Sequence, residues 1–238
     1  MPVQQASLDA LWNFDDPVAS EAALRRVADL VTDPVERAEL QTQVARALGL
    51  QGRFEEAEAL LAAVPRLDPV VVARIELERG RLLNSAGDPD AALPHFLRAR
   101  TTARQAGEDF LLLDALHMAA IVDAERADVW FQEAMQELAD IRDARTQRWT
   151  IALCTNYGWH LHDAGRFAEA LELFRAAVTA SVRLGTAEQL FVARWAEARC
   201  LRSLGRRAEA LVLQQALHLE RPDDEYVTEE LAMLRKQR

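Results

Sequence analysis

The sequence predicts an all-α protein, a right-handed α-solenoid of helical hairpins with a capping segment at each end. Apolar residues recur three and four positions apart along most of the chain, and no alternating run indicates a strand. At five places a small residue is followed twelve positions later by an alanine, and this pattern recurs every 35 to 43 residues, which is typical of stacked helical repeats. The five pairs are Ala45/Ala57, Gly80/Ala92, Ala115/Ala127, Gly158/Ala170 and Ala198/Ala210.

The elements follow in order from this pattern. We expect an N-terminal cap over 1–34, an array of five hairpins over 35–219 and a C-terminal cap over 220–238, together forming one continuous solenoid domain. The capping helices are expected at 5–13, 16–31 and 223–236, and the hairpins at 35–64, 70–105, 108–140, 145–184 and 187–219. The last helix begins acidic and ends basic, which agrees with the helix dipole and with a polar end to the array.

Prolines and glycines mark the helix boundaries. Pro17, Pro34 and Pro89 each follow an aspartate, a pattern that predicts an N-cap with proline at the first helical position. Glycines lie between the two helices of four hairpins, where a tight turn needs a left-handed backbone. These glycines are Gly52, Gly87, Gly165 and Gly205.

The small residues are expected at helix crossings. Two helices approach closely only where the side chains between them are small. We therefore expect Gly158 and Ala170 to face each other across the fourth hairpin, with Tyr157, Phe167 and Phe174 filling the space beside them.

The repeated units resemble the tetratricopeptide repeat (TPR) family over about residues 35–219. The clearest unit is 156-NYGWHLHDAGRFAEALELFRAAV-178, which carries the large, small, apolar and turn residues of that family at matching positions. The fifth unit matches at Ala198, Leu201 and Gly205 but departs at Arg207 and Gln214, where aromatic residues are common in the family. The resemblance implies the fold and the binding of proteins or peptides, and nothing narrower.

In a TPR-like stack the first helix of each hairpin lines the concave face, so exposed residues on those helices are the candidate site. The site residues expected there are Arg46, Arg81, Asn84, Asn156, Trp159, His162, Trp195, Arg199 and Arg202. One interpretation is a groove for an acidic peptide or a C-terminal carboxylate, held by guanidinium groups with the tryptophans as apolar anchors. The other is that the arginines pair with neighbouring acids and the tryptophans pack between repeats. The lysines of the familiar TPR carboxylate clamp are absent from these helices.

Composition limits the partners. The formal net charge of −10 argues against nucleic acid or an anionic membrane as the main partner, because both bind positively charged surfaces.

Cys154 and Cys200 lack zinc-site spacing and are expected to be buried thiols. The start of the sequence has no secretory signal pattern, and lysine occurs only at Lys236, as in GC-rich genomes. We expect a cytoplasmic bacterial protein.

Catalysis is not expected, because no nucleophile elbow, phosphate loop, metalloprotease motif or dinucleotide fingerprint is present. His160 and His162 are two residues apart on a helix, so they point in different directions and cannot share a metal in the usual way. Asp114 and His117 share a face but supply only half of a dinuclear pattern. We expect no cofactor and no metal.

Three functions remain open at this stage. The leading prediction is a non-enzymatic scaffold that binds a protein or an extended peptide in its groove. The alternatives are a regulatory receptor that senses a peptide or small ligand, and an array that assembles with its own copies. The N-terminal residues Leu11, Trp12 and Phe14 are expected to cap the first hairpin, or alternatively to occupy the groove.

Overall fold

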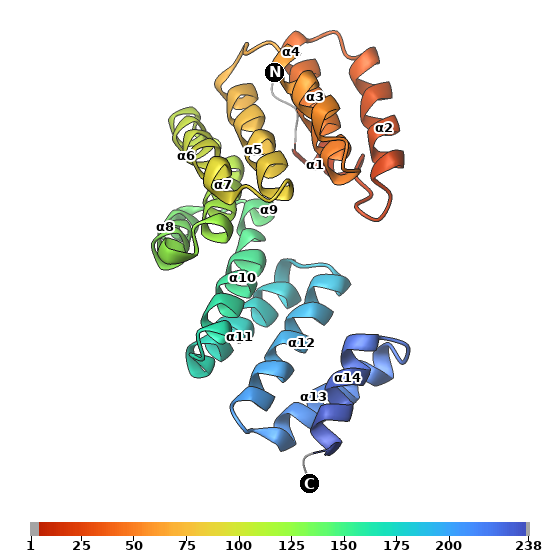
Figure 1. The fold of residues 1–238 in the computed structure, drawn as a ribbon, viewed down its shortest axis with the longest axis vertical. Coiled ribbons are helices and arrows are strands. Elements are labelled where there is room, and N and C mark those ends of the chain that lie inside the picture. Colours follow the sequence, from red (N-terminus) through yellow and green to blue (C-terminus); the bar gives the residue numbers. More distant parts are fainter. Residues whose placement is uncertain (1–4, 237–238) are drawn as a thin grey trace. The chain divides into compact units, whose positions relative to one another are not determined.

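The computed structural model describes residues 5–236, and every regular element in this part of the chain is a helix (Figure 1). This confirms the all-α class and the series of helical hairpins expected of an α-solenoid. The chain divides into two compact units between Asp123 and Ala124. Each unit is described separately below.

Unit 1 contains a capping pair, two complete hairpins and one further helix. The helices are α1 (Gln5–Asp9), α2 (Pro17–Leu30), α3 (Pro34–Leu50), α4 (Phe54–Ala63), α5 (Pro69–Ser85), α6 (Pro89–Ala106) and α7 (Asp109–Val122). Helices α3/α4 and α5/α6 form the hairpins, α2 packs on α3, and α7 packs on α6 and α5. Leu8 of α1 is fully buried with residues of α2 and α3, and Leu11 and Trp12 pack against the same core, as expected of a cap.

Unit 2 contains two complete hairpins between additional helices. Its elements are η1 (Ala124–Arg126), α8 (Ala127–Asp140), α9 (Ala144–Gln147), α10 (Trp149–Asp163), α11 (Phe167–Leu184), α12 (Ala187–Ser203), α13 (Arg207–Glu220) and α14 (Glu225–Lys236). Helices α10/α11 and α12/α13 form the hairpins, α8 packs on α10, and α14 packs on α13 and α12 (Figure 1).

The predicted caps and turns are confirmed. The aspartate before each of Pro17, Pro34 and Pro89 accepts a hydrogen bond from a backbone amide in the first helical turn, at 2.9 to 3.0 Å. The four turn glycines all have positive φ, with values of 74°, 87°, 74° and 74°. Non-glycine side chains rarely adopt this backbone conformation, so the sequence marks these turns reliably.

Three boundaries differ from the prediction. The first helix ends at Asp9 and continues as tight turns, in which the Leu11 amide bonds to the Leu8 carbonyl oxygen at 3.0 Å. The fourth hairpin is preceded by a separate short helix, α9, whose start is capped by Asp143. The predicted third hairpin spans the division between the units, with α7 in unit 1 and α8 in unit 2. A single continuous domain therefore stays a prediction.

No helix within residues 5–236 has both the length and the apolar composition that a membrane crossing requires.

The small residues of the repeat are all buried, and the two glycines have a specific neighbour. A Cβ atom on Gly80 would lie 2.4 Å from Cε1 of Phe96, and one on Gly158 would lie 2.7 Å from Cε1 of Phe174. The glycines therefore make room for an aromatic ring of the second helix. The prediction named the alanine of that helix as the partner, whereas the ring one turn further along fills the space.

Candidate functional site

The predicted site residues of unit 1 lie on the first helices of its two hairpins. Helix α3 packs against α5, and α5 packs against α7. We refer to the surface formed by α3, α5 and α7 as the first-helix face of unit 1. Arg46 on α3 and Arg81 and Asn84 on α5 are partly buried there and line one cavity of about 200 Å³. The structure thus brings these three predicted residues together.

Arg81 is held by two internal carboxylates. Its Nη1 donates to Oε1 of Glu78 and its Nη2 donates to Oδ1 of Asp114, each at 2.5 Å. Glu78 and Asp114 are only 2% and 5% exposed. Burial alone would raise the pKa of Asp114, but attraction to Arg81 and Arg46 outweighs it and lowers that pKa below its usual value. The guanidinium of Arg81 is therefore already neutralised inside the protein.

Arg46 differs from Arg81 because no Asp or Glu within residues 5–236 forms an ion pair with it. Its guanidinium lies over the rings of Trp12 and Phe14, 5.6 and 5.5 Å from their centroids, and these two rings stack on each other. Burial, together with the nearby charge of Arg81, lowers the pKa of Arg46, which still leaves an arginine protonated at neutral pH. Glu78 and Asp114 act on Arg46 only through longer-range attraction, so Arg46 brings to the cavity a positive charge that forms no ion pair with an Asp or Glu of residues 5–236.

The N-terminal segment reaches this face as well as the core of the first hairpin. Nε1 of Trp12 donates a hydrogen bond of 3.3 Å to Oε1 of Gln43, one turn before Arg46 on α3. The aromatic pair Trp12/Phe14 thus covers one side of Arg46. The cavity lies on the side of Arg46 that faces α5, where Glu78, Arg81 and Asn84 line it.

His117 on α7 lies close to the same charges. Burial is the main cause that lowers its pKa, to about 4, while Asp114 raises it and Arg81 lowers it further. The imidazole is therefore neutral at pH 7. No group of three His, Cys, Asp or Glu side chains able to hold a metal ion occurs in residues 5–236.

In unit 2, the two predicted tryptophans lie side by side on α10 and α12, the first helices of its hairpins. The ring centroids of Trp159 and Trp195 are 5.8 Å apart, and Tyr226 of α14 continues the row at 5.9 Å from Trp195. Trp159 also contacts the ring of Phe174 at 4.8 Å. Both tryptophans are partly buried, whereas Tyr226 is 69% exposed. We refer to Trp159, Trp195 and Tyr226 as the aromatic row.

The remaining polar residues predicted for this face have different environments. Asn156 is exposed on α10. His162 lies against Trp159, with ring centroids 5.2 Å apart, and its Nε2 is 2.9 Å from Oγ of Ser203 on α12. His162 therefore bridges two helices of unit 2.

Arg199 and Arg202 on α12 share one carboxylate from α14. Glu230 accepts from Nη1 of Arg199 at 2.5 Å and from Nε and Nη2 of Arg202 at 2.6 and 2.9 Å. Glu230 is 3% exposed, and although burial opposes its ionisation, these hydrogen bonds lower its pKa below the usual value. The two arginines thus anchor the C-terminal helix.

The sequence analysis missed the carboxylates that serve these arginines, which are Glu78, Asp114 and Glu230. The same arrangement recurs between successive first helices. Glu39 and Arg74, Arg81 and Asp114, and Arg199 and Glu230 are ion pairs separated by 35, 33 and 31 residues. These separations are close to the repeat length, so a search for opposite charges at that spacing would have found them.

Comparison with known proteins agrees with this architecture of helical hairpins. The family model described as tetratricopeptide repeat matches residues 40–63 and 151–176, which lie in the α3/α4 and α10/α11 hairpins. These two hairpins therefore match tetratricopeptide repeats, the family that the sequence resembles. No curated protein sequence matches it.

Solved structures share the fold at low sequence identity. BtubC (BKLC) from P. vanneervenii is 16% identical, with 90% of this chain and 91% of that one covered at a TM-score of 0.66. A Rap protein in complex with Competence and Sporulation Factor is 15% identical, with 92% of this chain and 68% of that one covered at a TM-score of 0.60. At these identities the likeness shows the fold alone.

Proposed function

We propose that the protein is a non-enzymatic interaction scaffold whose first-helix faces bind a protein partner or an extended peptide. The TPR hairpins support this function, as does the shared fold with a Rap protein that was solved with a bound factor. The observation that carries the proposal is Arg46, which lines a cavity of about 200 Å³ and forms no ion pair with an Asp or Glu of residues 5–236. A partly buried guanidinium is stabilised most by an anionic group that also accepts its hydrogen bonds.

The chemistry of the cavity favours one acidic group of the partner. A carboxylate side chain or a C-terminal carboxylate would pair with Arg46, and the amide of Asn84 on the opposite helix would supply a further donor. Arg81 would keep its pairs with Glu78 and Asp114. Binding of the acidic partner expected from the sequence is therefore proposed to depend on Arg46 alone among the arginines of unit 1, and not on a row of arginines.

The face of unit 2 offers aromatic surface in place of unpaired positive charge, because Glu230 occupies both Arg199 and Arg202. Trp159 and Trp195 are proposed as apolar anchors for the partner. Reversing the charge of Arg199 and Arg202 would put three carboxylates together and detach α14, so a loss of binding in that variant would not locate the site.

The sharper experiment compares Arg46→Met with Arg26→Met as baits for affinity capture from a lysate of the source organism. Both changes remove one positive charge, and Arg26 lies exposed on α2, away from the cavity. A partner retained by wild type and Arg26→Met, and bound at least about tenfold more weakly by Arg46→Met, supports the proposal, because charged hydrogen bonds contribute about 1.5–3 kcal/mol. Equal retention by both variants with unchanged circular dichroism contradicts it.

The receptor and self-assembly alternatives remain distinguishable from the scaffold in solution. A self-assembling array would show a mass above 26.7 kDa by light scattering at micromolar concentration. A sensing receptor would change its radius of gyration in small-angle scattering when the captured ligand is added. A scaffold with preformed faces would show neither change.

A further inference from the structure

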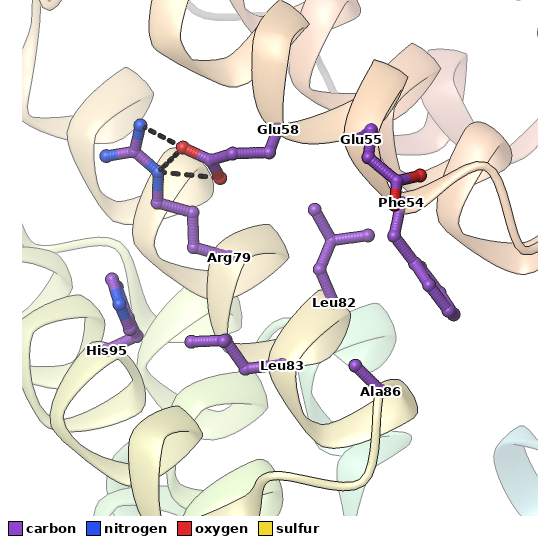
Figure 2. A pocket seen from close by; sticks show the side chains of 8 residues that line it. All are labelled: Phe54, Glu55, Glu58, Arg79, Leu82, Leu83, Ala86 and His95. Atoms are coloured by element: carbon purple, nitrogen blue, oxygen red, sulfur yellow. Dashed lines mark hydrogen bonds and ion pairs between the residues drawn. The ribbon is translucent and has the colours of Figure 1, made fainter.

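A second and larger cavity of unit 1 lies between α4, α5 and α6 (Figure 2). Its volume is about 670 Å³, within the range of cavities that take small organic molecules. Figure 2 shows Leu82 and Leu83, from the last turn of α5, at its centre, with Ala86, which directly follows α5, beside them. Phe54, from the first turn of α4, lies across from them. The cavity therefore has a predominantly apolar lining.

The charged groups around this cavity are neutralised with one exception. Arg79 donates to both carboxylate oxygens of Glu58, at 2.7 to 3.2 Å, which closes one side (Figure 2). Nδ1 of His95 lies 2.8 Å from Oε2 of Glu76. Glu55 has no hydrogen-bond or ion-pair partner within residues 5–236, and its side chain is drawn next to Phe54 at the opposite side from Arg79 (Figure 2).

Glu55 and Phe54 form one edge of the cavity from the same helical turn. A carboxylate next to an aromatic ring attracts an organic cation twice, through the ion pair and through the negative face of the ring. The apolar body of such a cation would lie on Leu82 and Leu83 and remove their surface from water. The lining thus complements a single positive charge attached to an apolar group.

We propose that this cavity is a second binding site, which takes a small organic cation with an ammonium group on an apolar body. Glu55 pairs with the ammonium, Phe54 contacts it through the ring face, and Leu82 and Leu83 hold the apolar part. The Arg79–Glu58 ion pair bounds the cavity on the side opposite Glu55. Because both of its charges are already paired, it offers no partner for a second charged group on the ligand. This site takes a positive ligand, in contrast to the acidic group proposed for Arg46.

The test uses 2-phenylethylammonium as the probe, with the leucine methyl resonances of the full chain as the readout. Saturable shifts of the Leu82 and Leu83 methyl groups are expected, and the neutral isostere 2-phenylethanol should bind more weakly. Glu55→Gln should weaken the probe about two- to five-fold, which is the range for an exposed ion pair. Arg46→Met should leave the probe affinity unchanged, which separates this site from the proposed function.

Glu225→Gln provides the matched control. Glu225 is also an exposed first-turn glutamate, on α14 of unit 2, and it does not line this cavity. Three results would each overturn the proposal. They are the absence of saturable shifts at millimolar probe, an equal effect of Glu55→Gln and Glu225→Gln, and binding of the anion 3-phenylpropionate as strong as that of the ammonium.

Discussion

The ring of Phe174 occupies the space in which a Cβ atom on Gly158 would lie, with Cε1 only 2.7 Å from that position. Gly80 and Phe96 repeat the relationship in unit 1, at 2.4 Å. Both rings are fully buried. Glycine is thus required at these two first-helix positions because the facing second helix carries phenylalanine, and the two residues should be considered as a pair.

The first prediction concerns this pair. Gly158→Ala should lower the free energy of unfolding by about 1–3 kcal/mol through overpacking, even though alanine favours a helix by about 1 kcal/mol over glycine. In a protein that also carries Phe174→Leu, Gly158→Ala should lower the free energy of unfolding by less, because the smaller leucine side chain leaves room for the alanine methyl group. Urea denaturation of the four proteins gives the coupling energy, and additive effects would contradict the pairing.

The second prediction concerns Gln214, which stands at the Phe174 position of the next hairpin. Gln214 is fully buried, and neither its Oε1 nor its Nε2 has a hydrogen-bond partner within residues 5–236. Gln214→Leu should raise the free energy of unfolding by about 1–3 kcal/mol, because it removes an unsatisfied buried amide. Gln136→Leu, an exposed substitution in the middle of α8, should change it by less than about 0.5 kcal/mol. A destabilised Gln214→Leu would mean that the amide has a partner such as a buried water.

The third prediction concerns the carboxylate shared by Arg199 and Arg202. Glu230→Gln should lower the melting temperature and reduce the free energy of unfolding by about 1–3 kcal/mol, since two partly buried guanidinium groups lose their counter-charge. Glu229→Gln, on the exposed side of α14, is the matched control and should have little effect. Because the pKa of Glu230 is lowered in the folded state, its contribution is present above the unfolded pKa and is lost as the pH falls through the folded pKa. The two variants should therefore converge in strong acid.

The fourth prediction concerns the pH dependence that His117 introduces. Its pKa of about 4 in the folded state lies below the usual histidine value of 6.5, so the folded state binds fewer protons than the unfolded state between these two values. Stability should be complete above pH 6.5 and fall by up to about 3 kcal/mol as the pH drops to 4. His117→Gln should flatten this decline between pH 5 and 6.5, where most carboxylates are still ionised. An identical decline in His117→Gln and in the control His160→Gln would rule out His117 as its source.

The fold was largely predictable because its signals are local. The aspartate–proline starts, the turn glycines and the apolar spacing each act within a few residues. The aspartate–proline starts are confirmed in unit 1, and the turn glycines are confirmed in both units. The helices of the third hairpin, α7 and α8, lie within the predicted range 108–140, and their connection, which lacks a glycine, forms the 3-10 turn Ala124–Arg126.

The site was only partly predictable because its side chains contact partners that lie about one repeat away in the sequence. Spacing placed Arg46, Arg81, Arg199 and Arg202 on first helices. Whether a guanidinium is available depends on acids 28 to 33 residues away or on the same helix. The sequence offered both interpretations, and the structure assigns internal carboxylates to three of these four arginines. The cavity of Figure 2 depends on how α4 and α5 pack and carries no sequence motif.

The stack of Trp12 on Phe14 under the guanidinium of Arg46 has an optical consequence. Indole emission responds to a nearby charge, and Arg46 lies 5.6 Å from the Trp12 ring. A ligand that draws the guanidinium toward the cavity would change the field at this indole. Once the other four tryptophans are replaced by phenylalanine, the chain would carry a single indole, which lies beside the Arg46 cavity of unit 1. Occupancy could then be followed by fluorescence without attaching a dye.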